Sequence, residues 1–309
     1  MHLLNVLTKT LRLRAFAKIN AGLKVLARRR DGFHELRTIY QTLALHDRLE
    51  LSLAFEGKGI EVACDNQAIP GGRGNLVFAA CTLWKEVREF EGGIRVKLEK
   101  RIPAGSGLGG GSSDAAATLV GLERLTGNRL DRMTRFKLAA RLGSDVPLFF
   151  YGGRVLGCGR GEQVYPLLDL PSRPCLVVSP GFAVSTAEAY RALDNDRARP
   201  RRLTEAAQPF SIDDFGVRSS LPQETWGPAE NDFEQVVFAR WPELADLKCR
   251  LIRAGAEIAS LTGSGSAVYA IFPSARQLIG AWKLTPAGWR AFRTRTLSRR
   301  EYHRLLFKD

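Results

Sequence analysis

The fold is decided by the stretch Ile102-Pro103-Ala104-Gly105-Ser106-Gly107-Leu108-Gly109-Gly110-Gly111-Ser112-Ser113-Asp114-Ala115-Ala116. Before it, residues 94–99 alternate apolar and charged side chains, which is the pattern of a half-buried strand. After it, small helix-favouring residues continue to about Thr126, with Ser and Asp expected at the helix cap. Glycines let successive backbone N–H groups converge, and a helix start adds donors and partial positive charge. The stretch therefore predicts a phosphate cradle between a strand and a helix rather than a flexible surface turn.

Other glycine-loop families fit this stretch poorly. A Walker A loop ends in Gly-Lys-Ser or Gly-Lys-Thr, and the sequence contains neither. Gly105, Gly107 and Gly110 satisfy G-x-G-x-x-G, but a dinucleotide site also needs an acidic residue at the end of the next strand. Asp131 has about the right spacing and yet lies in a helical pattern. The lysine strand and His-Arg-Asp run of protein kinases are missing.

Length and composition predict a globular protein of two domains. A chain of 309 residues favours two domains with a cleft between them. Its 45% hydrophobic and 25% charged residues are typical of soluble proteins, and no apolar run is long enough to span a bilayer. Five scattered cysteines, none in a C-x-x-C pair, favour reduced thiols and argue against a zinc site. Residues 1–7 lack a secretory pattern, so we expect a cytoplasmic protein without a membrane partner.

The formal net charge of +14 has two interpretations. It suits a nucleic-acid-binding surface or a basic surface around a site for polyanionic small molecules. Much of the excess lies in residues 197–202 and 290–308, which match no zinc finger, RRM or homeodomain. A solvated basic face is the favoured explanation of these runs.

Residues 11–26 alternate in the manner of one or two antiparallel strands. Lys18 lies in this pattern, and its spacing alone favours a solvent-facing lysine. The pair Asp31-Gly32 then predicts a hairpin turn. Phe33 and His34, just beyond it, offer a ring and two nitrogens to a ligand, although a lone histidine is more often structural.

Helical spacing marks residues 75–90 and 131–142. The next residues, Ser144-Asp145-Val146-Pro147, predict a short helix that Ser144 or Asp145 caps, with Pro147 in its first turn. Capping and catalysis are about equally compatible with Asp145 at this point.

The composition becomes proline-rich from about Pro171, which divides the chain into residues 1–170 and 171–309. In the second part we expect strands at 175–178, 257–261, 267–272 and 289–296, and helices starting at Ser185 and covering 231–240, 243–254 and 298–307. The polar residues 194–226 are expected to be loop and linker. Thr262-Gly263-Ser264-Gly265-Ser266 forms a further glycine loop between two strands.

Three separated stretches resemble the GHMP small-molecule kinases, in the same order. They are Ala17-Lys18-Ile19-Asn20, the central loop of residues 102–116, and the late loop of residues 262–266. The resemblance implies an α+β fold of two domains, with a ribosomal protein S5 domain 2-like, ATP-binding N-terminal half (1–170) and a ferredoxin-like C-terminal half (171–309). It also implies an active site in the cleft between the halves.

The resemblance implies a role for each matching residue. Lys18 and Asp145 are the catalytic pair: Asp145 accepts or orients the proton of the attacking hydroxyl, and Lys18 counters charge on the transferring phosphoryl group. ATP is the phosphate donor, with Mg²⁺ near Ser113 or its neighbour Ser112. The residues expected at ATP are Asn75, Pro103, Ala104, Gly105, Ser106, Gly107, Leu108, Gly109, Gly110, Gly111, Ser112 and Ser113. Those expected at the acceptor are Asn20, Phe33, His34, Thr186, Gly263 and Ser264.

Within the family, the chain is most similar to members whose acceptor is a cytidine diphosphate-linked methylerythritol. The segments that carry this likeness are residues 17–20, 31–36 and 142–147, supported by 157–162. The likeness implies ATP-dependent phosphorylation of the 2-hydroxyl of that acceptor in the non-mevalonate isoprenoid pathway. His34 would read the cytosine edge, and Phe33, where the family usually has tyrosine, would lie against a base face.

Three other functions are weighed against this one. A GHMP kinase for mevalonate, homoserine or a sugar has no use for a base-reading histidine at His34. An RNA-binding protein explains the charge but not Lys18, Asp145 and both serine-bearing loops. A degenerate nucleotide binder is disfavoured by the intact Lys18 and Asp145. We therefore expect ATP and one small acceptor as partners of a monomer or homodimer, without nucleic acid or membrane.

Overall fold

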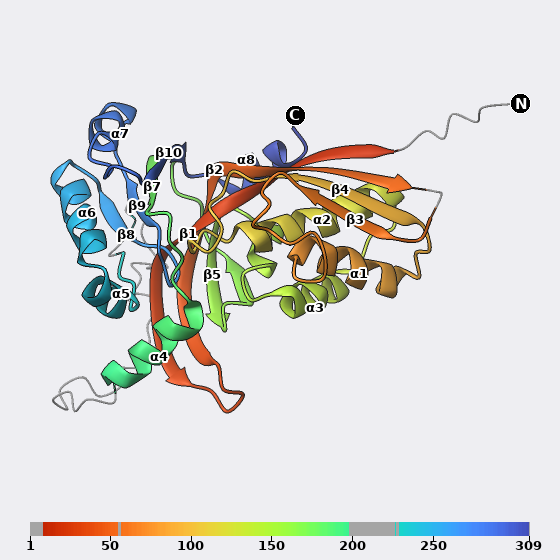
Figure 1. Cartoon of the computed structure of the whole chain (residues 1–309), viewed down its shortest axis with the longest axis horizontal. Coiled ribbons are helices and arrows are strands. Elements are labelled where there is room, and N and C mark those ends of the chain that lie inside the picture. The colour runs from red at the N-terminus through yellow and green to blue at the C-terminus, as the bar shows by residue number, and fades with distance from the viewer. Residues whose placement is uncertain (1–8, 55–56, 198–225, 227–228, 309) are drawn as a thin grey trace, which may run out of the picture.

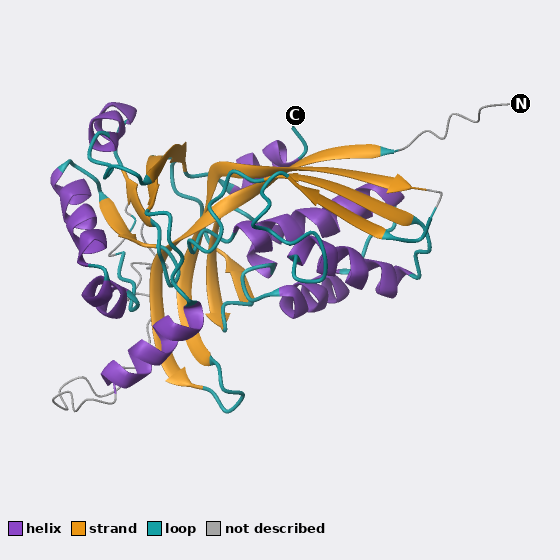
Figure 2. Cartoon of the chain, viewed as in Figure 1, coloured by secondary structure: helices purple, strands orange, loops and turns teal. Residues whose placement is uncertain are grey.

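Two β-sheets form the framework of the chain, one in each half (Figures 1 and 2). The computed structural model describes residues 9–54, 57–197, 226 and 229–308. The first sheet has the order β3-β4-β2-β5-β6, with β1 paired to β2, and three helices, α1 to α3, lie along one face of it. The second sheet is antiparallel and has the order β10-β7-β9-β8. With its connections through helices, this order is the ferredoxin-like topology that we expected.

The elements have the following bounds. The first-sheet strands are β1 Thr10–Arg28, β2 His34–Ala54, β3 Ile60–Cys64, β4 Gly93–Glu99, β5 Arg154–Gly159 and β6 Gln163–Pro166, with helices α1 Leu76–Arg88, α2 Gly110–Thr126, α3 Arg132–Leu142 and the 3₁₀ turn η1 Pro147–Phe150. The second-sheet strands are β7 Pro174–Ser179, β8 Ile258–Leu261, β9 Val268–Ile271 and β10 Arg290–Arg295, with helices α4 Thr186–Arg197, α5 Glu234–Arg240, α6 Pro242–Arg253, α7 Ala275–Trp282 and α8 Arg299–Leu306.

Most predicted elements are confirmed within one to three residues, and the differences are local. The predicted loop from Asp194 is still helix α4 as far as Arg197, and residues 198–225 lie outside the described part of the chain, as do residues 1–7. Strands β3, β5 and β6 and helix α7 were not predicted, because segments of four to eight residues are too short to establish a period. No helix in the described residues is long and apolar enough to cross a membrane.

The two halves are joined by a shared apolar core on β1 and β2. Ala17, Ile19 and Ile39 of the first sheet pack with Val177 and Ile271 of the second sheet in one buried cluster. Strands β1 and β2, of 19 and 21 residues, are long enough to serve both halves. The cleft between the halves is therefore built on a common pair of strands rather than on a linker.

The predicted division at residue 170 falls between β6 and β7, where the chain passes from one sheet to the other. After β10 the chain returns to the first half, where Tyr302 and Leu306 of α8 are buried in the core. The boundary itself stays a prediction.

A buried charged cluster holds the glycine loop to the first sheet. Lys100, whose side chain is 5% exposed, pairs with Asp47 of β2 and with Asp114 of α2, the latter at 2.7 Å. Asp47 also accepts hydrogen bonds from the backbone N–H groups of Arg101 (2.6 Å) and Ile102 (2.8 Å), directly before the loop. Asp114 is therefore not the helix cap that we expected: α2 begins at Gly110, and its N-cap residue is Gly109, which has a left-handed backbone and no side chain to cap the helix.

Two carboxylates share one ammonium in this cluster, which makes the stability of the protein depend on pH. Burial raises the pKa of Asp114 to about 8; Lys100 opposes this rise and Asp47 adds to it. A carboxyl group with a higher pKa in the folded chain binds more protons when folded, so the free energy of unfolding falls as the pH rises from 3.8 towards 8. We expect Asp114→Asn to remove this dependence, so that its thermal midpoint falls less than that of the wild type between about pH 6 and pH 8.

The matched control for this measurement is Asp246→Asn, because Asp246 is an exposed residue of α6 that pairs only with Arg250 at 3.5 Å among the described residues. Its midpoint should follow the wild type at each pH. Equal pH slopes for Asp114→Asn and the wild type would contradict the assignment.

Candidate active site

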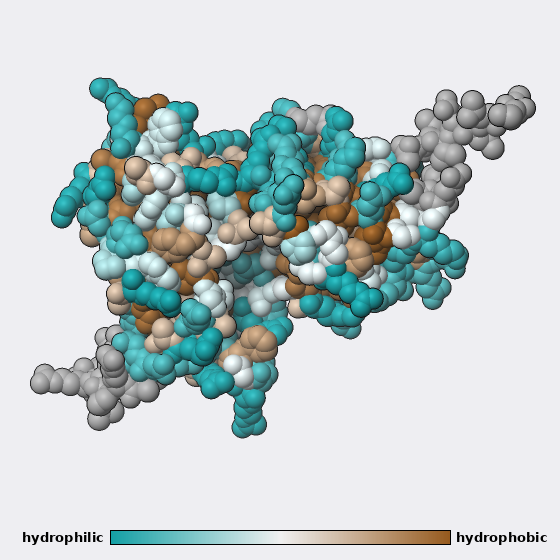
Figure 3. Space-filling view, viewed as in Figure 1, coloured by the Kyte–Doolittle hydropathy of each residue, from teal (hydrophilic) through white to brown (hydrophobic). Residues whose placement is uncertain are grey.

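A cleft of about 570 Å³ lies between the two halves of the chain. Residues of β1, β2, the glycine loop and the turn before η1 line it from the first half, and residues of α4 and the late glycine loop line it from the second. Figure 3 shows the surface hollowed where the halves meet. The cleft brings together ten of the twenty residues that the sequence nominated: Lys18, Asn20, Phe33, His34, Gly107, Ser112, Asp145, Thr186, Gly263 and Ser264.

Lys18 is buried at the floor of the cleft, although its spacing alone favoured a solvent-facing position. Its side chain is 3% exposed, and Nζ lies 3.2 Å from Asp145 Oδ2. Nζ also donates to Asn20 Oδ1 at 2.7 Å. A cation buried this deeply needs such partners, because an unpaired charge away from water is costly.

Asp145 does not cap the short helix, which corrects the capping alternative. The residue before η1 is Val146, and no side chain caps this turn in the described chain. Instead, Asp145 Oδ1 accepts a hydrogen bond of 2.9 Å from the hydroxyl of Tyr40 on β2. Burial, and then the charge of Asp145, raise the pKa of Tyr40 well above its ordinary value. Tyr40 therefore acts as a hydrogen-bond donor that holds one carboxylate oxygen while Lys18 faces the other.

Asn20 connects both halves of the chain at the floor of the cleft. Its side-chain amide donates to Thr38 Oγ1 at 2.7 Å, and its backbone N–H donates to Thr262 Oγ1 at 3.2 Å. Its carbonyl accepts from the hydroxyl of Tyr269 at 2.9 Å. These bonds fix the orientation of Asn20 Oδ1 towards Lys18.

The central glycine loop closes over Lys18 and leaves the start of α2 open to an anion. The Lys18 backbone N–H donates to the carbonyl of Leu108 at 2.9 Å, and Thr262 Oγ1 donates to the carbonyl of Gly107 at 3.2 Å. A Cβ on Gly107 would collide with the carbonyl oxygen of Thr262, and one on Gly109 would lie 3.0 Å from Lys18 Cγ. Because no side chain caps α2, its first backbone N–H groups remain available to phosphate oxygens.

The far end of the cleft carries aromatic rings and a histidine. His34 stacks on Tyr190 of α4 with ring centroids 4.7 Å apart, and its Nε2 lies 2.7 Å from Asp194 Oδ1. Phe33 is 52% exposed, and the Arg160 guanidinium covers its ring at 4.6 Å. Burial, and then the charge of Asp145, raise the pKa of Tyr190. Flat rings and the ring nitrogens of a buried histidine suit a heteroaromatic base.

The late glycine loop meets α4 through its hydroxyls. Thr186 Oγ1 lies 2.9 Å from Ser264 Oγ, at the cleft wall. Asn231 supports the loop from behind, since its amide donates to the carbonyls of Leu261 and Gly263 at 2.9 Å each. Gly263 is thus held at the cleft by Asn231, which does not itself line it, and Ser264 is held by Thr186, which does.

Ten of the twelve residues expected at ATP do not line the cleft: Asn75, Pro103, Ala104, Gly105, Ser106, Leu108, Gly109, Gly110, Gly111 and Ser113. Asn75 caps α1: its Oδ1 accepts from the Val77 N–H at 2.8 Å and its amide donates to the carbonyl of Pro70 at 2.9 Å. The Ser113 hydroxyl is buried and has no partner among the described residues. Their contacts with ATP and Mg²⁺ stay predictions.

Sequence reasoning did not nominate Tyr40, Arg160, Tyr190 and Asp194, although all four line the cleft. They come from β2, the turn after β5 and helix α4, and nothing in their local patterns indicates that these elements converge. Only the glycine- and arginine-rich run around Arg160 was noted as a whole, without a role for this side chain.

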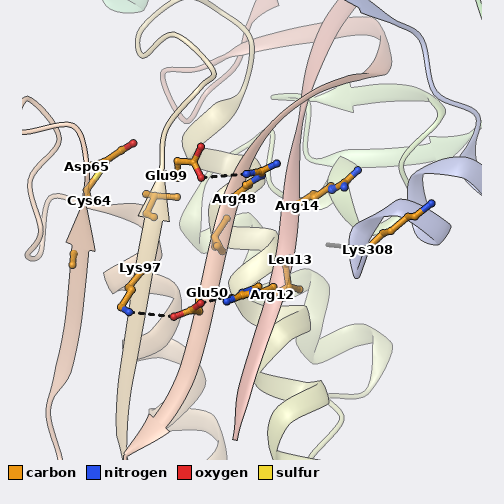
Figure 4. A pocket seen from close by; sticks show the side chains of 13 residues that line it. Arg12, Leu13, Arg14, Arg48, Glu50, Cys64, Asp65, Lys97, Glu99 and Lys308 are labelled. Atoms are coloured by element: carbon orange, nitrogen blue, oxygen red, sulfur yellow. Dashed lines mark hydrogen bonds and ion pairs between the residues drawn. The ribbon is translucent and has the colours of Figure 1, made fainter. Parts of the chain in front are cut away.

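A second hollow, of about 650 Å³, lies on the solvent-facing side of the first sheet, opposite the face that the helices cover (Figure 4). Five of its charged side chains pair with one another: Arg12 lies 3.1 Å and Lys97 3.3 Å from Glu50, and Arg48 lies 3.7 Å from Glu99. None of the predicted site residues lines it. The candidate active site is therefore the smaller cleft between the halves.

Comparisons with known proteins identify the family of the chain. Residues 75–153, which include the glycine loop and Asp145, match the model of the GHMP kinases N terminal domain. The chain is 43% identical over 300 residues to a 4-diphosphocytidyl-2-C-methyl-D-erythritol kinase of Solibacter usitatus, covering 96% of this chain and 92% of the relative. It is 36% identical to the protein of the same name in Geobacter sulfurreducens, covering 94% of this chain and all of that relative.

Solved structures give the same result for the fold. A crystal structure of 4-(cytidine 5'-diphospho)-2C-methyl-D-erythritol kinase superposes with a TM-score of 0.72 at 34% identity, covering 92% of this chain and 98% of the other. A mevalonate kinase of L. major, at 16% identity and a TM-score of 0.65 over 94% of this chain and 97% of the other, shares the fold. The predicted α+β GHMP fold is thus confirmed, and the chain belongs to the 4-diphosphocytidyl-2-C-methyl-D-erythritol kinase family of the GHMP kinases.

Proposed function

We propose that Lys18 and Asp145 carry out, in this chain, the reaction of its family: ATP-dependent phosphorylation of the 2-hydroxyl of 4-diphosphocytidyl-2-C-methyl-D-erythritol, which gives the 2-phosphate and ADP. This reaction is a step of the non-mevalonate route to isoprenoid precursors. The observation that carries the proposal is the 3.2 Å pair of Lys18 and Asp145, which lies between the open start of α2 and the aromatic end of the cleft. The partners are then ATP and this acceptor, and the reaction takes place in the cytoplasm.

Asp145 accepts or orients the proton of the attacking hydroxyl. Tyr40 occupies Oδ1 and Lys18 faces Oδ2, so the carboxylate presents a fixed edge to the acceptor. Lys18 stabilises charge that develops on the transferring phosphoryl group, a step in which positioning and electrostatics supply most of the catalysis. Asn20, which holds Lys18 Nζ at 2.7 Å, keeps that charge aimed at the cleft.

The start of α2 would hold the ATP phosphates and, with them, Mg²⁺. The described residues contain no group of three or more His, Cys, Asp or Glu side chains that could hold a metal ion, which suits an ion bound mainly by phosphates. Ser112 lines the cleft and the buried Ser113 hydroxyl has no partner among the described residues, so either fits as a protein ligand. When bound, Mg²⁺ neutralises charge on the phosphate oxygens.

The aromatic end would bind the cytidine of the acceptor. If Nε2–H of His34 donates to Asp194, Nδ1 is left as an acceptor. An acceptor suits the exocyclic amine of cytosine and not the carbonyl at the same position of uracil. Phe33, backed by Arg160, and Tyr190 supply flat faces for the base.

Replacement of the proposed base should stop transfer and leave ATP binding intact. We expect Asp145→Ala to lower kcat by about 10²- to 10⁴-fold, because a positioned general base contributes that much. The measurement is phosphate transfer from ATP·Mg²⁺ to the acceptor, with ATP affinity determined by calorimetry. Asp246→Asn, on the surface of α6, should keep wild-type activity. A wild type that binds ATP and does not turn over would redirect the proposal to another GHMP acceptor.

The hydroxyl of Tyr40 should matter for kcat more than for substrate binding. Tyr40→Phe removes the 2.9 Å bond to Asp145 and keeps the ring, so we expect kcat to fall about tenfold as Asp145 loses one of its two fixed contacts. Tyr165→Phe, on an exposed ring of β6, is the matched control. Unchanged kcat in Tyr40→Phe would show that Lys18 alone is sufficient to orient the carboxylate.

Loss of His34 should act on the acceptor and not on ATP. We expect His34→Ala to raise the KM of the cytidine substrate about tenfold or more, the cost of one lost specific contact to a base, with the KM of ATP unchanged. The preference for the cytidine over the uridine acceptor should fall in parallel. Equal changes in both KM values would indicate a structural role for His34 in the hairpin.

A further inference from the structure

The last helix, α8, packs beneath the turn that carries Asp145, and none of the roles above involves it. Tyr302 of α8 is 3% exposed and its hydroxyl donates to the carbonyl of Phe149, in η1, at 2.6 Å. The ring packs against Phe16 of β1 with centroids 5.2 Å apart. It also fills the space beside Gly152, where a Cβ would collide with it and the backbone is left-handed. The turn that follows Asp145 is therefore shaped around this one ring.

Phe149 carries the contact from Tyr302 to the reacting groups. Its backbone carbonyl faces Tyr302, whereas the tip of its ring faces the glycine loop: the position of a Cβ on Gly109 lies 3.2 Å from Phe149 Cζ. The same position lies 3.0 Å from Lys18 Cγ and 3.2 Å from Lys18 Cε. Three groups thus meet beside Gly109: the start of α2, the Lys18 side chain and the ring of Phe149, which follows Asp145 by four residues in the sequence.

Helix α8 is anchored independently of that turn, so it provides a fixed reference. Leu297, just before the helix, donates its N–H to the carbonyl of Thr42 on β2 at 2.9 Å. The first residue of the helix, Arg299, donates its N–H to Asp169 Oδ2 at 2.8 Å. Arg295 and Glu301 form an ion pair at 3.0 Å across the start of the helix. Because β10 leads directly into α8, the helix also links the second sheet to the turn.

We propose that Tyr302 is a positioning residue for phosphoryl transfer, acting through Phe149 to hold the η1 turn, and with it Asp145, in register with Lys18. The inference rests on the proposed function of that pair. A catalytic carboxylate displaced by a fraction of an ångström loses alignment with the hydroxyl without losing affinity for either substrate. The role of Tyr302 therefore concerns kcat and not KM.

The test compares two tyrosines of the same region. Tyr302→Phe removes the hydroxyl that reaches Phe149 and keeps the ring over Gly152. Tyr151→Phe removes a hydroxyl one residue after η1 that accepts from Arg132 on α3 at 2.6 Å, on a contact that does not involve Phe149. We expect Tyr302→Phe to lower kcat about tenfold with both KM values within about twofold of the wild type, and Tyr151→Phe to leave kcat unchanged. Thermal unfolding establishes that each variant is folded at the assay temperature.

A second variant covers the case in which Tyr302→Phe fails to fold. Phe149→Leu shortens the ring that faces Gly109 and keeps the carbonyl that Tyr302 binds, and it should show the same fall in kcat at unchanged KM. Wild-type kcat in folded Tyr302→Phe, or equal losses in Tyr302→Phe and Tyr151→Phe, would overturn the proposal, because both results describe a residue that matters for packing alone. An inactive wild type would instead count against the proposed function, which keeps the two failures distinct.

Discussion

The buried ammonium of Lys18 is the constraint on which the rest of the site depends. A cation with a side chain 3% exposed is tolerated only where acceptors surround it. One acceptor, Asn20, lies two residues along the same strand, and the other, Asp145, comes from a turn 127 positions further on. The cleft is therefore arranged so that elements distant in sequence meet at one nitrogen. A negatively charged phosphoryl group that enters the cleft would give the Lys18 ammonium a further partner of opposite charge.

The conformation of the glycine loop depends on its contacts with the rest of the protein as much as on the phosphates that it is proposed to bind. Gly107 approaches the carbonyl of Thr262 so closely that no side chain fits, and Gly109 leaves room for Lys18. The backbone of the loop is held by the second half of the chain through Thr262 and by β1 through Leu108. Two of its glycines are thus required by the packing of protein against protein, before any nucleotide is considered. The start of α2 is open because its N-cap residue, Gly109, has no side chain, whereas Asp114 lies inside the helix and pairs with Lys100.

The helices, strands and loops around the site could be predicted from the sequence better than the side-chain contacts within it. The strand–loop–helix unit around residues 102–116 follows from local pattern alone, because glycine spacing and strand alternation are both local properties. Local pattern was wrong for the exposure of Lys18 and left Asp145 undecided, since neither residue carries a sign of its partner nearby in the chain. The family resemblance supplied that pairing. Neither local pattern nor the family resemblance identified Tyr40 and Tyr190 as cleft residues, because an aromatic residue within a strand or helix is ordinarily a core residue.

One feature of β1 limits how this protein can change. Residues 15–23 are buried without interruption, because one face of the strand lies in the core of the first half or lines the cleft, and the other packs on the second sheet. A one-residue slip turns every side chain of a strand to the opposite face, and here both faces are buried. Insertion or deletion of a single residue would exchange Lys18 and Asn20 with their apolar neighbours. It would also turn away from the second sheet the side chains of β1 that now pack on it. The floor of the cleft and the interface between the halves therefore depend on the same register of β1, and neither can change without the other.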